Sequence, residues 1–216
     1  MLRILICALL LTWTSFGFAQ EPDNIALTKK KLLSYHDSQA YIKDLNDIIQ
    51  EAIIYLKLRL KERNFTGKPA IVLDIDETAL SNYKSIVELD FGGTLKEIRA
   101  NQDKGEDPAI APTLALYRFA KSQHVAVFFL TGRQEYERSA TAANLKRAGY
   151  ENWDGLILRS KKEASLPAAA YKKAARAELE KQGYEIILNI GDQFSDLSGG
   201  HSDKAFKLPN PYYLIP

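Results

Sequence analysis

The sequence predicts an α/β fold in which helices cover both faces of a parallel sheet. After Pro69, short continuous apolar runs alternate with helical stretches, and this alternation is typical of βαβ units. The composition is that of a globular chain, since 46% of the 216 residues are hydrophobic and 26% are charged. These values exclude a disordered, collagen-like or disulfide-stapled chain, and the length suits one domain with a full core.

Four apolar runs predict strands, and a fifth, shorter run is a further candidate. The four are Ala70 to Ile75, Val125 to Leu130, Gly155 to Leu158 and Ile186 to Ile190, and the fifth is Ala205 to Leu208. Helices are predicted between them over Thr113 to Gln123, Glu135 to Ala148 and Ala168 to Gln182. Pro112 suits a first helical turn, and Gly149 and Gly183 suit the left-handed residue that follows a helix.

Two segments lie outside this alternation. Between residues 24 and 66 we expect an N-terminal helical element, because apolar positions from Ser38 to Glu62 recur every three or four residues. After the first strand, residues 81–111 form a long polar connection that contains glycine and mixed charges. Connections of this length inside a compact domain are usually functional, so we predict a small lid insertion here.

Residues 1–19 have the features of a secretory signal peptide. One early charge, Arg3, is followed by an apolar run from Ile4 to Leu11 and by small residues at positions 17 and 19. The apolar core is much shorter than the roughly 20 residues of a membrane span, so a transmembrane anchor is the weaker alternative. We therefore expect cleavage after Ala19, a secreted or periplasmic protein without a stable membrane anchor, and one domain of residues 20–216.

Composition and missing motifs exclude several kinds of site. The chain has one Cys and one Met, Cys7 and Met1, so after cleavage no disulfide, zinc-thiolate site or thiol nucleophile remains. With 29 basic and 27 acidic side chains, no large basic surface is expected for a nucleic acid. The GxSxG, HExxH, GxxxxGK and strand-linked GxGxxG motifs of other enzyme classes are also missing.

Carboxylates follow two of the predicted strands. Asp74 and Asp76 come at the end of the first strand, and Asp192 and Asp196 follow the fourth. Because ligands of open α/β sheets bind at the carboxyl ends of the strands, these side chains should meet at one rim. Close carboxylates either share protons or bind a metal, and ligands that are all oxygen favour a hard cation, so we predict Mg²⁺.

This arrangement predicts phosphoryl transfer. A Mg²⁺ held by few carboxylates keeps positions for water and a phosphate oxygen. Asp74, deeper in the strand, suits a nucleophile that forms an aspartyl-phosphate. Asp76, two residues on and on the same side of an extended chain, suits the general acid and base.

Donors for the transferred phosphoryl group are also expected. Thr131 and Gly132, at the end of the second strand, offer a hydroxyl and backbone N–H groups. Lys172 and Lys173, on the helix before the fourth strand, can each supply a positively charged donor for the phosphoryl oxygens.

Four motifs together resemble those of the haloacid dehalogenase (HAD) superfamily. They are Asp74–Thr78, Leu130–Arg133, Tyr171–Lys172 with Arg176, and Asn189–Leu197. More narrowly, the chain resembles the secreted acid phosphatases that include the bacterial class B and class C enzymes and the plant enzymes related to vegetative storage proteins. The ending Phe206–Tyr213 is similar to the plant-type group. The resemblance implies a Rossmann-like HAD fold and an acid phosphatase acting on a small phosphomonoester.

The resemblance also implies roles for single residues. Asp74 would be both nucleophile and Mg²⁺ ligand, and Asp76 would be acid and base and a ligand through its backbone carbonyl. Asp192 would be a further metal ligand, and Asp196 would be a carboxylate beside the ligands that does not itself bind the metal. Lys172 is favoured over Lys173, because the family places this lysine 20 residues before the first aspartate of the last motif.

Some alternatives stay open at this point. A non-catalytic storage or binding protein could retain the fold, although Asp74 and all its expected partners are present. Arg133 suits a structural ion pair as well as a substrate contact. In the lid, Tyr83 and Phe91 can stack on an aromatic leaving group or pack on the domain. The sequence does not separate nucleotides, sugar phosphates and aromatic phosphates as substrates.

Overall fold

The computed structural model describes residues 21–216, and it contains one five-stranded sheet. The predicted signal peptide lies outside the described residues. The strand order is β3-β2-β1-β4-β5, and every neighbouring pair is parallel. The strands are β1 (Lys68–Leu73), β2 (Ala126–Gln134), β3 (Gly155–Arg159), β4 (Tyr184–Gly191) and β5 (Lys204–Lys207). All five predicted strands are confirmed, including the short fifth.

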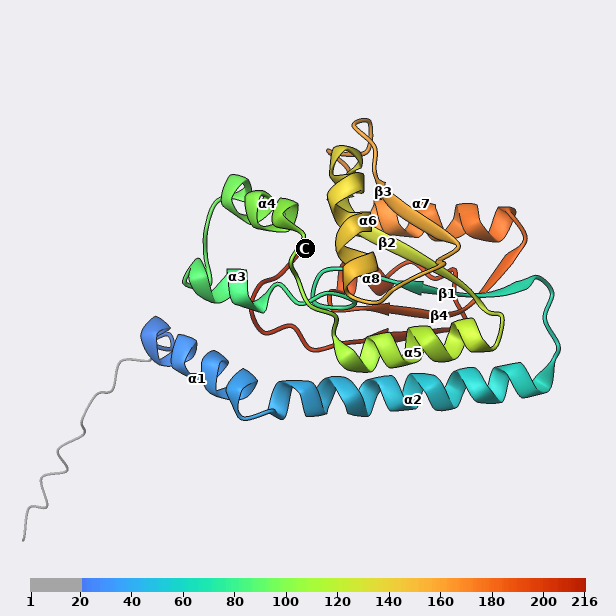
Figure 1. The fold of residues 1–216 in the computed structure, drawn as a ribbon, viewed down its shortest axis with the longest axis horizontal. Helices are drawn as coiled ribbons and strands as arrows, with labels where there is room; N and C mark the ends of the chain where they lie inside the picture. The colour runs from blue at the N-terminus through green and yellow to red at the C-terminus, as the bar shows by residue number, and fades with distance from the viewer. Residues whose placement is uncertain (1–20) are drawn as a thin grey trace, which may run out of the picture.

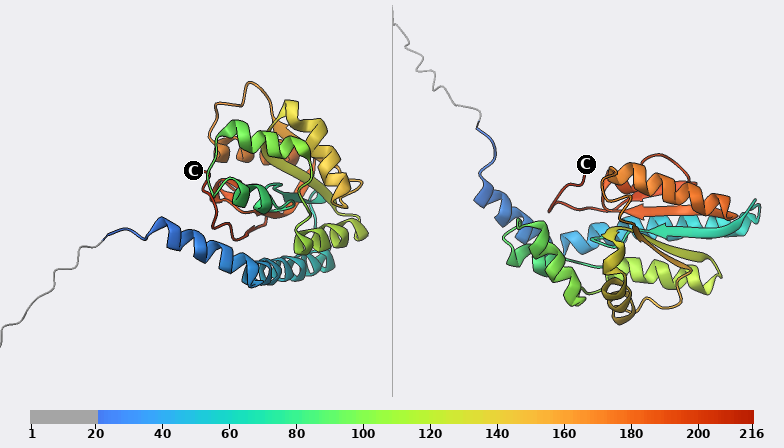
Figure 2. Two further views of the ribbon diagram at one scale, coloured as in Figure 1. Left: turned by 60° about the vertical axis from the view of Figure 1, so that its left-hand side comes forward. Right: turned by 90° about the horizontal axis from the view of Figure 1, so that it is seen from above.

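Helices cover both faces of the sheet, as Figures 1 and 2 show. One face packs against α2 (Ala40–Glu62), α5 (Ala111–Ser122) and α6 (Arg138–Arg147), and the other against α7 (Ala168–Lys181). Short helical turns, η1 (Glu135–Glu137) and α8 (Phe194–Leu197), follow β2 and β4. The α/β prediction is therefore confirmed.

The central strand β1 explains why the apolar runs are continuous. Ile71 and Leu73 belong to the core on the side of α2 and α5, whereas Ala70 and Val72 belong to the core on the side of α7. Successive side chains of a strand point to opposite faces, and here both faces are buried. The same burial leaves the carboxyl ends of β1 and β4 as the places where polar residues can cluster.

The N-terminal element consists of two helices instead of the single predicted one. A first helix, α1 (Ile25–Asp37), precedes α2, and its N-cap Asn24 accepts hydrogen bonds from the backbone N–H groups of residues 26 and 27. Gln39 lies between the helices in the left-handed region, with φ of 67°. This residue separates α1 from α2, which packs its apolar stripe on the sheet.

The insertion, residues 81–111, contains helices that the sequence analysis does not predict. These are α3 (Tyr83–Glu88) and α4 (Leu95–Lys104). The start of α4 is stabilised by a capping box, in which Thr94 and Glu97 satisfy each other's backbone N–H groups. Gly105 ends the helix in the left-handed conformation. The polarity of the segment reflects its exposure, since none of the α3 or α4 residues is fully buried.

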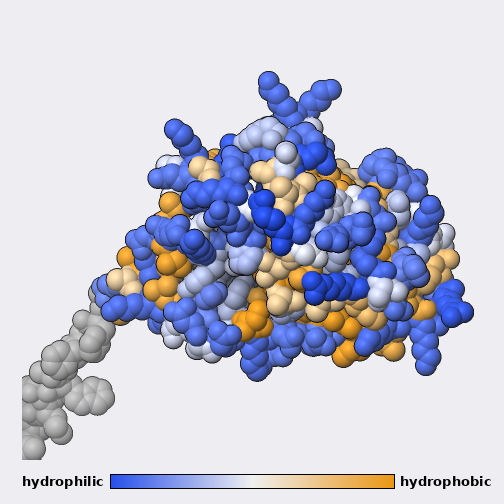
Figure 3. All heavy atoms as spheres, viewed as in Figure 1, coloured by the Kyte–Doolittle hydropathy of each residue, from blue (hydrophilic) through white to orange (hydrophobic). Residues whose placement is uncertain are grey.

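The surface seen in Figure 3 is mostly hydrophilic, with apolar residues in separate areas. Within residues 21–216, no helix combines the length and the hydrophobicity that a membrane crossing requires.

Candidate active site

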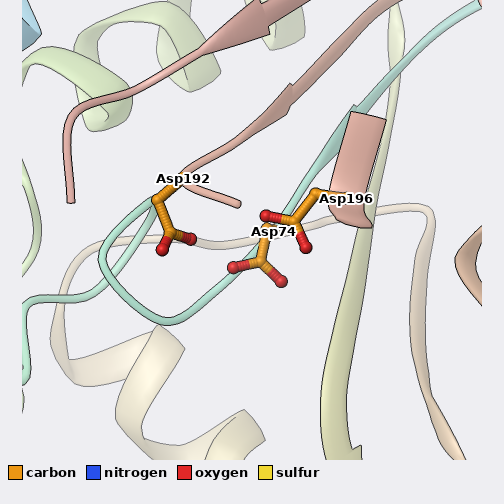
Figure 4. A group of neighbouring side chains, drawn as sticks. All are labelled: Asp74, Asp192 and Asp196. Atoms are coloured by element: carbon orange, nitrogen blue, oxygen red, sulfur yellow. The ribbon is translucent and has the colours of Figure 1, made fainter. Parts of the chain in front are cut away.

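Three carboxylates meet at the carboxyl end of the sheet. Asp74 follows β1, Asp192 follows the neighbouring strand β4, and Asp196 lies in α8 (Figure 4). The backbone N–H of Asp74 donates to the carbonyl of Ile190 at 2.9 Å, which continues the sheet pairing up to the site. Carboxylate oxygens of the three residues lie within 4.8 Å of one another, and all three side chains are buried.

Lys172 supplies the positive charge inside this cluster. From the first turns of α7 its ammonium group donates to Asp74 Oδ1 and, at 2.6 Å, to Asp196 Oδ1. Burial alone would lower the pKa of Lys172, but the two carboxylates raise it above its ordinary value. Its neighbour Lys173 is exposed. The structure thus brings Lys172, and not Lys173, to the carboxylates.

Asp192 is held by neutral donors only. Thr78 Oγ1 donates to its Oδ1 at 3.2 Å, and the side-chain amides of Gln193 and Asn210 each donate to its Oδ2 at 2.7 Å. Within residues 21–216 it forms no ion pair with a basic side chain. Burial, followed by the charge of Asp196, raises its pKa.

The charges of the cluster do not balance. Of the three buried carboxylates, two share the ammonium group of Lys172 and the third, Asp192, has no ion pair among residues 21–216. Burial raises the pKa of Asp74 well above its ordinary value, although Lys172 acts in the opposite direction. Excess buried negative charge is costly unless it is protonated or bound to a cation. The donor set consists of oxygen atoms, so the residues fit a hard divalent cation.

The loop after β4 holds Asp196 over the end of the strand. A Cβ on Gly191 would lie 2.4 Å from the Asp196 side chain, so only glycine permits this approach. The backbone N–H of Gln193 donates to Asp196 Oδ2 at 2.8 Å. Arg176, fully buried on α7, donates to three backbone carbonyls between Asp196 and Gly200 at 2.5 to 3.0 Å. These bonds fix the loop that carries the third carboxylate.

Asp76 has a different environment, since β1 ends at Leu73 and Asp76 lies beyond it, where it forms an isolated β-bridge with Leu80. The guanidinium of Arg133 donates to its carboxylate at 2.6 Å, and the amides of Asn82 and Gln102 donate at 2.9 and 3.2 Å. Burial raises the pKa of Asp76, but the charge and hydrogen bonds of Arg133 outweigh this and lower it overall. Arg133 therefore forms a structural ion pair, one of the two roles left open by the sequence.

A cleft of about 600 Å³ opens beside these groups. It is lined by the three carboxylates, Lys172 and Asp76, and by residues of the insertion and of the C-terminal segment. The apolar lining residues are Ile86, Leu89, Phe91, Leu95, Ile98, Tyr212 and Ile215. Tyr83 packs instead against His36, with ring centroids 3.4 Å apart, and Phe91 lies 6.2 Å from the ring of Tyr212.

Comparison with known proteins identifies the family. The family model described as HAD superfamily, subfamily IIIB (acid phosphatase), matches residues 11–216. The chain belongs to the HAD subfamily IIIB acid phosphatases. Among curated relatives, the stem 28 kDa glycoprotein of Glycine max is 38% identical over 93% of this chain and 78% of its own length. Acid phosphatase 1 of Solanum lycopersicum is 32% identical over 94% and 83%.

Solved structures support the fold assignment. The class C acid phosphatase from Bacillus anthracis superposes with a TM-score of 0.74, covering 87% of this chain and 86% of that chain at 24% identity. The family resemblance and the HAD-type fold predicted from the four motifs are confirmed.

In this acid phosphatase, the predicted phosphate contacts of β2 lie at different depths. Thr131 is fully buried, and its hydroxyl accepts the backbone N–H of Arg133 at 3.1 Å. Gly132 is exposed and lines the cleft, where a Cβ would meet nothing within 4 Å. Gly132 thus presents its backbone directly to the cleft.

Glu77 is a buried acid that the sequence analysis does not single out. It accepts the backbone N–H of Asn82 at 2.6 Å and the hydroxyl of Tyr213. Glu77 therefore joins the loop after β1 to the start of the insertion and to the C-terminal segment. Burial, followed by the charge of Asp76, raises its pKa from 4.5 to about 8. Its place directly after Asp74 and Asp76 was a signal in the sequence.

We expect Glu77→Gln to flatten the pH dependence of stability. Between pH 4.5 and about 8 the folded protein holds a proton on Glu77 that the unfolded chain releases. The stability from this group is therefore complete below pH 4.5 and is lost as the pH rises to about 8. Urea unfolding of the metal-free protein at several pH values measures the effect.

The control for this experiment is Glu97→Gln. Hydrogen bonds from Thr94 lower the pKa of Glu97, so this exposed residue stabilises the folded protein in the opposite direction, above its pKa. If the wild type and Glu77→Gln lose stability equally between pH 5 and pH 8, the assigned protonation of Glu77 is wrong.

Proposed function

We propose that this acid phosphatase hydrolyses phosphomonoesters with the help of Mg²⁺ and through an aspartyl-phosphate on Asp74. The observation that carries the proposal is the cluster of three buried carboxylates around a single lysine at the end of a cleft. The excess negative charge of the cluster suits a divalent cation. The position of the cluster beside an open cleft suits the binding of a phosphate ester.

Asp74, Asp192 and the backbone carbonyl of Asp76 would hold the metal. Mg²⁺ prefers oxygen ligands and keeps several coordination positions for water or phosphate. When bound, it would offset negative charge on the phosphoryl oxygens. Asp196 would position Lys172, because its carboxylate accepts a hydrogen bond from the ammonium group.

Asp74 is the nucleophile in this proposal. Its carboxylate oxygen forms a bond to phosphorus while the bond from phosphorus to the leaving oxygen breaks. Lys172 acts against the effect of burial and so favours the ionised form of Asp74, and its ammonium group is available to the phosphoryl oxygens. The hydroxyl of Thr131 and the backbone N–H of Gly132 serve as further donors.

Asp76 gives its proton to the leaving oxygen and then takes a proton from the attacking water. The water oxygen bonds to phosphorus, the acyl-phosphate bond breaks, and inorganic phosphate and Asp74 are released. Arg133 lowers the pKa of Asp76 in the free enzyme. Because a nearby like charge raises a carboxyl pKa, the bound phosphate group favours the protonated Asp76 that the first step needs.

The apolar residues that line the cleft suggest the substrate class. Ile98 on α4 and Ile215 of the C-terminal segment both line the cleft and are 37% and 44% exposed. An apolar or aromatic leaving group would cover these side chains and remove their surface from water. We therefore favour phosphomonoesters with an apolar leaving group over sugar phosphates.

The remaining parts of the proposal concern location and partners. The N-terminal pattern up to Ala19 supports export to a secreted or periplasmic location, followed by a mature domain of residues 20–216 with a lid at residues 81–111. No nucleic-acid partner is expected from the charge balance. The storage-protein alternative is weaker, because a non-catalytic chain has no need of an intact carboxylate cluster.

We expect Asp74→Asn to lower the rate of p-nitrophenyl phosphate hydrolysis by more than about a thousandfold, because it removes the nucleophile. Chelation with EDTA should abolish wild-type activity, and added Mg²⁺ should restore it. Asp47→Asn, which changes a residue paired with Lys43 on α2, is the matched control and keeps full activity. Chelator-insensitive hydrolysis, or an active Asp74→Asn enzyme, contradicts the mechanism.

We expect Ile98→Ser to lower kcat/KM for p-nitrophenyl phosphate about fivefold, corresponding to the loss of about 1 kcal/mol of apolar contact. For glycerol 3-phosphate, which has no ring to cover Ile98, kcat/KM should stay within about twofold. An equal decrease for both substrates would mean that Ile98 supports the insertion and does not select the leaving group.

A further inference from the structure

The segment that follows β5 lies against the loop of the carboxylate cluster. Asn210 reaches Asp192, Tyr213 donates to Glu77, and the backbone N–H of Ile215 donates to Gln193 Oε1 at 3.0 Å. Three hydrogen bonds thus connect the C-terminal segment to Asp192, to its neighbour Gln193 and to Glu77, which lies three positions after Asp74.

The orientation of the Asn210 amide is fixed by its own turn. Its Oδ1 accepts the backbone N–H groups of Tyr212 at 2.9 Å and Tyr213 at 3.4 Å. An amide whose oxygen is occupied in this way must turn its NH₂ group in the other direction. That NH₂ group donates to Asp192 Oδ2 at 2.7 Å.

The donors around Asp192 differ in kind from those around Asp74 and Asp196. The latter two share the ammonium group of Lys172, which offsets part of their charge. Among the residues that the structure describes, only neutral amide and hydroxyl groups donate to Asp192. Neutral donors hold a carboxylate in place and leave its full charge for a cation.

We propose that Asn210 is a positioning residue of the metal site, and that its side-chain amide holds the Asp192 carboxylate in the orientation that binds a divalent cation. This inference rests on the proposed function, in which Asp192 is a metal ligand. Groups that hydrogen-bond a metal ligand commonly contribute a factor of 10 to 100 to metal affinity.

The other anchors of the segment allow the role of the amide to be tested separately. Ser195 Oγ donates to the carbonyl of Ile215 at 3.2 Å, and neither this bond, nor that of the Tyr213 hydroxyl to Glu77, nor that of the Ile215 N–H to Gln193 involves the Asn210 side chain. Tyr213→Phe removes a different anchor and leaves the Asn210 amide in place. Comparing Tyr213→Phe with the Asn210 variants therefore separates the effect of the amide from the effect of weakening the attachment of the whole segment.

The experiment is calorimetric titration of the metal-free full-length protein with Mg²⁺, without substrate. We expect Asn210→Ala to raise the Kd for Mg²⁺ at least tenfold. Tyr213→Phe and the matched remote variant Asn64→Ala, which removes an acceptor of Arg59, should stay within about twofold of the wild type. If Asn210→Ala does not fold, Asn210→Ser is measured in its place, because serine can keep the turn but is too short to reach Asp192.

Two results would overturn the inference. One is a Kd within twofold of the wild type for the Asn210 variants, and the other is an equal loss of affinity in Tyr213→Phe. Asp192→Asn serves as the reference for loss of a ligand. If the wild type itself does not bind Mg²⁺, the proposed metal dependence fails; if it binds and the Asn210 variants bind equally well, the inference alone fails.

Discussion

The buried contact of Lys172 with Asp74 and Asp196 is the constraint around which the site is built. A single ammonium group satisfies two carboxylates, so the cluster that also contains Asp192 retains excess negative charge. The fold maintains this arrangement by the pairing of β1 with β4, and by Arg176, which fixes the loop that carries Asp196. An interior of this kind is unfavourable without a cation, and this is the physical reason to associate the fold with metal-assisted phosphoryl chemistry.

The positions of the main carboxylates follow from the sequence because a parallel sheet brings the carboxyl ends of its strands to one edge. Asp74 and Asp192 are therefore predictable from two apolar runs and the residues after them. The choice between Lys172 and Lys173 depended on the family resemblance. In the structure the reason is geometric, since neighbouring helix residues differ by about 100° in direction and only one of them can face the sheet.

Other parts of the site could not be read from apolar periodicity. Asn82, Gln102 and Asn210 come from the insertion and the C-terminal segment, where no repeating pattern fixes the path of the chain. The sequence left the role of Arg133 open, because its partner Asp76 lies 57 positions away along the chain. The insertion did carry one local signal, the spacing of Thr94 and Glu97, which is that of a capping box and marks the start of α4.

Because the carboxylate cluster lacks positive charge, we expect a divalent cation to stabilise the folded protein by supplying it. The most direct measurement is the thermal unfolding midpoint of the wild type and of Asp192→Asn during a titration with Mg²⁺. At a Mg²⁺ concentration of about 100 times Kd, the wild-type midpoint should rise by roughly 5–10 °C, whereas that of Asp192→Asn should stay constant. A wild-type midpoint that does not change, or an equal rise in both proteins, would mean that the cluster does not bind the cation.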